Sequence, residues 1–301
     1  MKAPYESMRD FRRPALHDAS LGPVLTILVV MELVFAIGPA LPLLFMTEAA
    51  REAYELGATP FAVIQQLLTF GIFAAALTAL VRKLHGRGFW SMVGPPIETV
   101  ANIKTVGWAV FLLLLVQTFL PLWLDLSTVA EVRPILPWLM WIPITIAALV
   151  VQTGMEELYF RGYLQQQLAA LSDKRWIWMG VPSFLFGIGH YMNAYGPADG
   201  VLYVIWATAL GLACADLTAR TGNIGAAIGL HIANNLFAFV VSGVQGWPSS
   251  GLALLLFPYE DPFAYDYSLE ALFAPWAVFE IITMCLSVYV MWLAARIAIK
   301  K

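Results

Sequence analysis

The feature that most constrains this 301-residue chain is a series of apolar runs, each long enough to cross a membrane as a helix. A hydrocarbon core about 30 Å thick needs roughly 20 apolar residues, because each helical residue adds about 1.5 Å. The sequence therefore predicts an all-α, polytopic membrane helical bundle with about eight transmembrane helices. The predicted spans are residues 23–46, 60–81, 105–124, 138–160, 176–193, 201–219, 224–244 and 273–297.

Composition agrees with a chain that lies mostly in the bilayer. Hydrophobic residues make up 60% of it and charged residues only 12%, whereas soluble domains contain about a quarter charged residues. We expect one membrane domain over residues 1–301, with no separate soluble domain. The lipid bilayer is thus an expected partner, while the absence of a basic arm argues against nucleic acid. Cys214 and Cys285 lie in apolar runs, so no disulfide framework is expected.

Basic residues are distributed unevenly between the predicted loops. If the N-terminus is cytoplasmic, all of the 17 Lys and Arg residues except Arg51, Arg133 and Arg161 fall in cytoplasmic segments. This bias follows the positive-inside rule and favours an even number of spans with both termini cytoplasmic. The first apolar run is too long for a cleaved signal, so it is expected to stay in the membrane. A bacterial inner (plasma) membrane is the expected location.

The densest group of polar residues inside a predicted span surrounds Glu156 and Glu157. A charge near the bilayer centre costs about 2.5–3.5 kcal/mol on insertion scales, so it needs a partner, water or a function. Glu157 and Arg161 are four residues apart with the acid first, which favours an ion pair on one helix face. Glu156 lacks this helical partner and is the better candidate for proton transfer.

Two later spans carry further polar side chains. The fifth span ends at His190, with Phe186 one turn earlier in position to pack on its ring. In the seventh span, His231 and Asn235 are four residues apart and share a face, with Asn234 as the alternative amide. Each feature alone is more often structural, but together they bring a carboxylate, two imidazoles and an amide onto three helices. This combination predicts a functional site.

Peptide hydrolysis needs this set of groups. The reaction requires an activated water, a base that accepts its proton and donors for the developing oxyanion. Glu156 with His190 can activate the water, and His231 with Asn235 can donate to the oxyanion. No Ser-His-Asp signature or H-E-x-x-H helix is present. The expected partner is a peptide or protein substrate at the membrane.

Taken jointly, Glu156-Glu157-x-x-x-Arg161, Phe186-x-x-x-His190 and His231-x-x-x-Asn235 resemble the CPBP family, the CAAX protease and bacteriocin-processing family. This family includes the type II CAAX prenyl endopeptidases. The motif-bearing catalytic core covers about residues 138–240. The resemblance implies an eight-helix intramembrane endopeptidase with catalytic residues Glu156, His190, His231 and Asn235. It also implies that Glu157 and Arg161 shape the site.

Several alternatives stay open at the level of sequence. The family has been described as both metal-dependent and glutamate-dependent; we favour no metal, although Glu156, His190 and His231 could form a zinc site with one open position. A non-proteolytic binding or scaffold protein of the same fold is a second alternative. A proton- or ion-coupled transporter is the third, since acidic residues also lie in other spans. These are Glu32, Asp216 and Glu280, which we expect to pair across helices.

Overall fold

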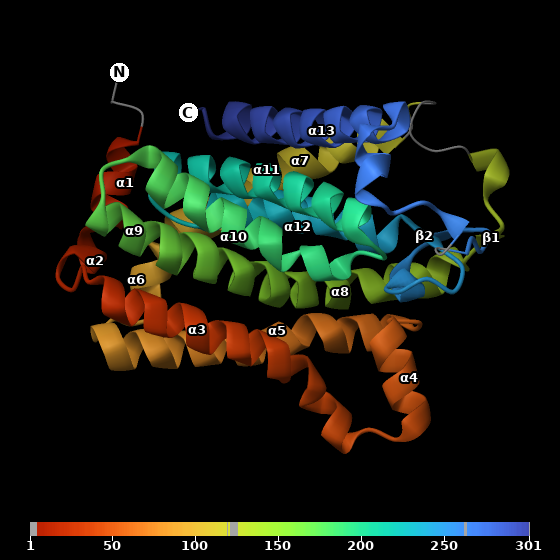
Figure 1. Cartoon of the computed structure of the whole chain (residues 1–301), viewed down its shortest axis with the longest axis horizontal. Coiled ribbons are helices and arrows are strands. Elements are labelled where there is room, and N and C mark those ends of the chain that lie inside the picture. Colours follow the sequence, from red (N-terminus) through yellow and green to blue (C-terminus); the bar gives the residue numbers. More distant parts are fainter. Residues whose placement is uncertain (1–4, 119, 121–125, 262–263, 301) are drawn as a thin grey trace.

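The computed structural model describes residues 5–118, 120, 126–261 and 264–300, and nearly all of its regular structure is helical (Figure 1). The apolar runs form helices because a helix satisfies its own backbone hydrogen bonds, which no water can do inside a bilayer. The all-α membrane bundle is therefore confirmed. Its main helices are α3 (Leu21–Ile37), α5 (Pro60–His85), α7 (Pro96–Thr118), α8 (Ile135–Glu157), α10 (Val181–Gly189), α11 (Pro197–Thr221), α12 (Gly225–Val240) and α13 (Pro275–Ile299).

Within the described residues, six helices are long and apolar enough to cross a membrane. The other two predicted spans are shorter than expected. Residues 176–193 form a π-helical turn, η5 (Trp176–Gly180), followed by α10, and residues 224–244 contain the 16-residue α12. A helix of that length spans only about 24 Å. Residues 119 and 121–124 of the third predicted span lie outside the described residues.

The direction of the chain alternates along the long axis of the molecule (Figure 1). The N- and C-termini lie at the same end, together with α1 (Glu6–Phe11), α2 (Arg13–Leu16), α6 (Trp90–Val93) and α9 (Gln166–Leu171). This arrangement is compatible with an even number of passes. The count of eight and the cytoplasmic location of the termini remain predictions.

The opposite end of the bundle carries a small sheet and the helix α4 (Glu48–Leu56) (Figure 1). The strands are β1 (Glu131–Val132), β2 (Ser242–Val244) and β3 (Leu255–Phe257), in the order β1-β3-β2. β3 pairs antiparallel with β1 and parallel with β2. β3 is therefore the central strand of the sheet.

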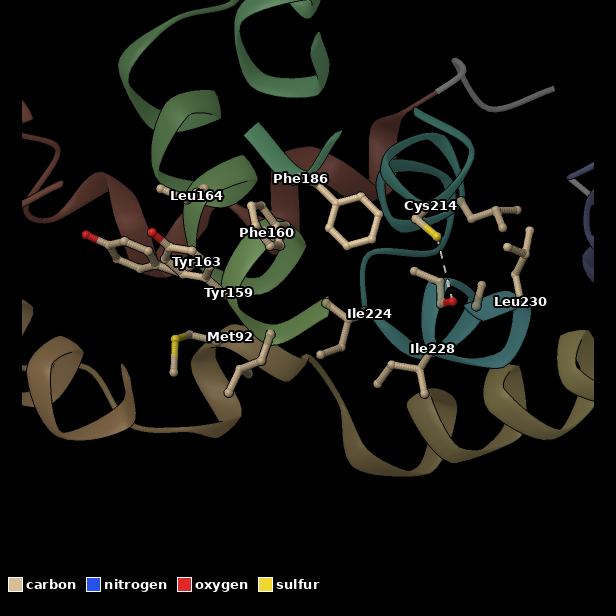
Figure 2. Close-up of a cluster of buried hydrophobic side chains, with 14 of the residues drawn as sticks. Met92, Tyr159, Phe160, Tyr163, Leu164, Phe186, Cys214, Ile224, Ile228 and Leu230 are labelled. Atoms are coloured by element: carbon tan, nitrogen blue, oxygen red, sulfur yellow. Dashed lines mark hydrogen bonds between the residues drawn. The ribbon is translucent and has the colours of Figure 1, made fainter. Parts of the chain in front are cut away.

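The core that positions the site lies between α8 and helices α10 to α12 (Figure 2). Figure 2 shows the Phe186 ring between Phe160 and Cys214, so an aromatic side chain of α10 fills the space between α11 and the segment that follows α8. Close approach of α10 and α11 depends on a small residue. A Cβ at Gly187 would lie 2.1 Å from Thr208 Oγ1 and 2.8 Å from the Val204 carbonyl oxygen. Small residues at such crossings allow helices to pack closely in membranes.

Candidate active site

The helix that carries the acidic pair changes its geometry immediately after that pair. α8 ends at Glu157, and the chain continues as a π-helical segment, η4 (Leu158–Gln165), in which every residue is buried. The wider π turn is rare and is often found at functional sites. Arg161 lies within this segment, and its Nη1 is 3.1 Å from Glu157 Oε1, with both side chains fully buried. The predicted ion pair is confirmed.

Contacts from two other helices hold the Arg161 guanidinium in place. Its Nη2 donates to the Gly211 carbonyl oxygen at 3.0 Å, and its central carbon lies 4.8 Å from the centroid of the Phe186 ring. A Cβ at Gly211 would lie 3.1 Å from Arg161 Nη2, so a larger residue would crowd this contact. Arg161 thus connects α10 and α11 to the carboxylate on α8.

His231 lies between the two neighbouring carboxylates. Its Nδ1 is 2.8 Å from Glu157 Oε1, and its Nε2 is 3.4 Å from Glu156 Oε2. Since a carboxylate accepts, Nδ1 carries a proton and donates to Glu157. The second contact is an ion-pair distance without hydrogen-bond geometry. Glu156, which has no partner at helical spacing, therefore faces a histidine from α12.

The two carboxylates have different surroundings. Glu157 is fully buried and shares one oxygen between Arg161 and His231, whereas the Glu156 side chain is 12% exposed. Glu156 Oε2 is buried without a hydrogen-bond partner among the described residues. Glu157 Oε2 is likewise buried without a partner among these residues, so what distinguishes Glu156 is its partial exposure. With both glutamates ionised and Arg161 charged, the group carries one net negative charge, which one proton on His231 or Glu156 neutralises.

His190 occupies the C-terminal end of α10. Its Nδ1 lies 2.8 Å from the Phe186 carbonyl oxygen, so Nδ1 donates and Nε2 remains available as an acceptor. The Phe186 ring is 4.5 Å from the His190 ring and 5.7 Å from the His231 ring, edge to face in both cases. Within the described part of the chain, His190 forms no ion pair with a carboxylate. His231, not His190, contacts Glu156.

Asn235 is held by a residue that the sequence interpretation missed. Its Nδ2 donates to Gln152 Oε1 at 3.0 Å, and its Oδ1 accepts from Asn234 Nδ2 at 3.0 Å. Gln152 lies four residues before Glu156, on the same face of α8. A glutamine in an apolar span, one turn from the candidate base, was the signal available in the sequence.

Comparison with known proteins agrees with this geometry. Residues 137–237 match the family of type II CAAX prenyl endopeptidases, Rce1-like. The predicted resemblance to the CAAX protease family is confirmed over this segment. The segment contains all seven residues of the three motifs, from Glu156 on α8 to Asn235 on α12.

One curated relative is the uncharacterized protein YyaK of Bacillus subtilis (strain 168), which is 33% identical over 87 residues. That match covers 29% of this chain and 29% of the relative, so the chain spans less than a third of the relative's length. No solved structure matches the chain. The family that residues 137–237 match consists of proteases, and six helices of the described residues are long and apolar enough for a multi-pass membrane bundle.

The donor set for zinc is not assembled in this conformation. No group of three His, Cys, Asp or Glu side chains among the described residues is arranged to hold a metal ion. The alternative ligands Glu156, His190 and His231 therefore do not fit a metal as they stand. His231 instead directs its two ring nitrogens at carboxylates, which are hydrogen-bond and ion-pair partners.

The other acidic residues in the predicted spans differ in whether their carboxylates have hydrogen-bond partners on other helices. Asp216 forms the expected contacts across helices: its oxygens accept from Arg220 Nε at 2.7 Å, Trp292 Nε1 at 2.9 Å and the Tyr5 hydroxyl at 2.6 Å. Burial, followed by the bond to Asp216, raises the pKa of Tyr5, which stays protonated as a donor. Glu32 and Glu280 are exposed, and within the described part of the chain no hydrogen bond or ion pair of their carboxylates across helices is found.

Proposed function

We propose that the protein is an intramembrane endopeptidase that hydrolyses a peptide bond near the membrane surface, with Glu156 as the general base. The observation that carries the proposal is the position of His231 between Glu156 and Glu157. A structural ion pair would need only Glu157 and Arg161. The second carboxylate is adjacent, partly accessible and without a hydrogen bond on one oxygen, which is the state a base requires.

Hydrolysis on this arrangement begins with a water beside Glu156. Glu156 accepts one proton as the water oxygen attacks the carbonyl carbon of the scissile bond, and the carbonyl electrons move onto its oxygen. His190 Nε2, left free because Nδ1 donates to Phe186, can accept the second water hydrogen and orient the attack. When the carbon–nitrogen bond breaks, Glu156 returns its proton to the leaving amine.

The developing oxyanion receives donors from α12. His231, when doubly protonated, keeps Nδ1 on Glu157 and can turn its Nε2 proton from Glu156 to the oxyanion. Asn235 supplies a second N–H once its amide leaves Gln152. Each such donor is typically worth about 10²–10³ in kcat. Glu157 and Arg161 act as positioning residues, because they fix the tautomer and orientation of His231.

The family match favours CAAX-type processing, in which the substrate is a membrane-associated protein. We propose a prenylated or other membrane-associated substrate and metal-independent water activation. A bacterial inner membrane is the proposed location. The transporter alternative gains no support from Glu32 and Glu280, which are exposed at the surface of the bundle.

The decisive experiment uses purified full-length protein with fluorogenic peptides that differ only in prenylation. We expect cleavage by the wild type and none by Glu156→Gln at equal thermal stability. Undiminished cleavage by Glu156→Gln would refute the assigned base. A chelator should leave the activity intact; a loss that zinc restores would instead support a metal-dependent mechanism.

A further inference from the structure

A cavity of about 390 Å³ opens at the end of the bundle that holds both termini. It lies between the N-terminal helix α1, which packs on α11, and the segment that joins α9 to α10. This cavity is separate from the candidate active site, because none of its lining residues belongs to the three motifs. Its lining residues are Tyr5, Met8, Arg9, Arg12, Ala169, Asp173, Arg175 and Trp178.

The lining is strongly basic. Three arginines face one acidic side chain, and that acid is already engaged: Arg12 Nη1 is 2.9 Å from Asp173 Oδ1. Arg12 also donates to the Ala169 carbonyl oxygen, which fixes it at the wall. Arg9 and Arg175 are exposed, and the Arg175 guanidinium lies 5.0 Å from the Tyr5 ring centroid. Two guanidinium groups thus remain in excess over the acid.

The floor of the cavity is apolar. Met8, Ala169 and Trp178 are the buried apolar residues of the lining. Trp176, which follows Arg175 in the chain, is 68% exposed at the start of η5. Exposed tryptophan at a helix end is typical of the boundary between headgroups and hydrocarbon. The arginines therefore lie at the depth where phospholipid headgroups lie.

From this combination we infer that the cavity binds a phosphate-bearing anion, supplied by the headgroup of an anionic phospholipid. Guanidinium groups bind phosphate through paired N–H donors, and the apolar floor can contact the glycerol and first acyl carbons. Basic pockets between membrane helices on the cytoplasmic side are known to select such headgroups. This site does not require the peptidase chemistry of Glu156, so it can be tested independently.

The test is native mass spectrometry of the full-length protein in neutral detergent, titrated with phosphatidylglycerol. Phosphatidylcholine with the same acyl chains and inorganic phosphate form the two comparison arms. We expect phosphatidylglycerol to bind most tightly and the double variant Arg9→Gln/Arg175→Gln to weaken it by roughly ten- to thirty-fold. Asp173→Asn should tighten binding by about five-fold, because it removes the opposing charge.

The matched control is Arg13→Gln/Arg82→Gln, which removes the same charge from exposed positions outside this cavity. It should change binding by less than about three-fold. An equal loss in the control would mean non-specific attraction, and equal binding of phosphatidylcholine would mean no anion selectivity; either result overturns the inference. Arginine-dependent binding of inorganic phosphate with no preference for the lipid would identify a soluble anion as the ligand instead.

Discussion

His231 Nδ1 lies 2.8 Å from Glu157 Oε1, the same oxygen that lies 3.1 Å from Arg161 Nη1. One buried carboxylate oxygen therefore fixes both a guanidinium one helical turn away and an imidazole 74 residues away in the chain. This relationship leaves Glu156, the neighbouring acid, without a comparable constraint. The two glutamates can then be separated by experiment, because they should respond differently to the same substitution.

Glu156→Gln is expected to abolish proton transfer while preserving the fold. Loss of a general base lowers kcat by about 10²–10⁴-fold, and KM should change little because the amide keeps the shape of the side chain. Steady-state kinetics on a fluorogenic peptide, together with a thermal unfolding curve, measure both quantities. A variant that unfolds at much lower temperature would show that Glu156 is structural.

Glu157→Gln is expected to act mainly on stability. It leaves the Arg161 charge buried without its partner, which costs about 3–5 kcal/mol in the free energy of unfolding. The double variant Glu157→Gln/Arg161→Met removes both charges and should be more stable than the glutamine variant alone. Thermal unfolding of the wild type, the two single variants and the double variant gives the coupling free energy between Glu157 and Arg161. Additive losses would contradict a direct interaction between the two side chains.

Gln152→Leu tests how Asn235 is positioned. Without its acceptor the Asn235 amide can rotate, and we expect kcat to fall about ten-fold with KM nearly constant. Asn235→Ala alone should cost about 10²-fold. The decisive measurement is the double variant, which should be no slower than Asn235→Ala. Further slowing would mean that Gln152 acts independently of Asn235.

The close contact between α10 and α11 predicts that alanine substitutions at two glycines of α10 differ in their effect on the free energy of unfolding. Gly187→Ala places a methyl group against Thr208 Oγ1 and the Val204 carbonyl oxygen, and such overpacking costs about 1–3 kcal/mol. Gly189→Ala has no neighbouring atom within 4 Å and should leave the free energy of unfolding nearly unchanged. Equal melting temperatures for the two variants would mean that the helices can separate without loss.

Topology can be tested by thiol labelling in a Cys214→Ser/Cys285→Ser background. A cysteine at Lys300 should react only with reagents on the cytoplasmic side, and one at Arg51 only with reagents on the other side. These positions are exposed, so labelling reports location and not burial. Labelling of both positions from the same side would contradict the predicted orientation.

The sequence alone was sufficient to predict the membrane class and one ion pair, because both depend on local spacing. The Glu157–Arg161 pair follows from helical periodicity and is present as predicted. Contacts between helices could not be obtained in this way. The partner of Glu156 comes from α12, and the acceptor for Asn235 is Gln152 on α8. Their positions depend on how three helices cross.

Helix lengths were predicted less well for a related reason. Hydropathy reports how apolar a run is, but not whether its helix continues unbroken. In residues 176–193 the helix begins with a π turn, and its α-helical part ends at Gly189. In residues 224–244 the helix ends at Val240. The exposure of Glu32 and Glu280 could not be predicted from hydropathy either. How a helix is rotated about its axis is set by packing against neighbouring helices.

The hydrogen bond from the Tyr5 hydroxyl to Asp216 joins residues 211 positions apart in the chain. At ribosomal rates of about 5–20 residues per second, α1 waits roughly 10–40 seconds for its docking site to be made. During that time the segment stays outside its final position, because its partner is synthesised 211 residues later. Assembly of this end of the bundle is therefore a late event in biogenesis, and bulky N-terminal fusions should slow maturation more than C-terminal ones.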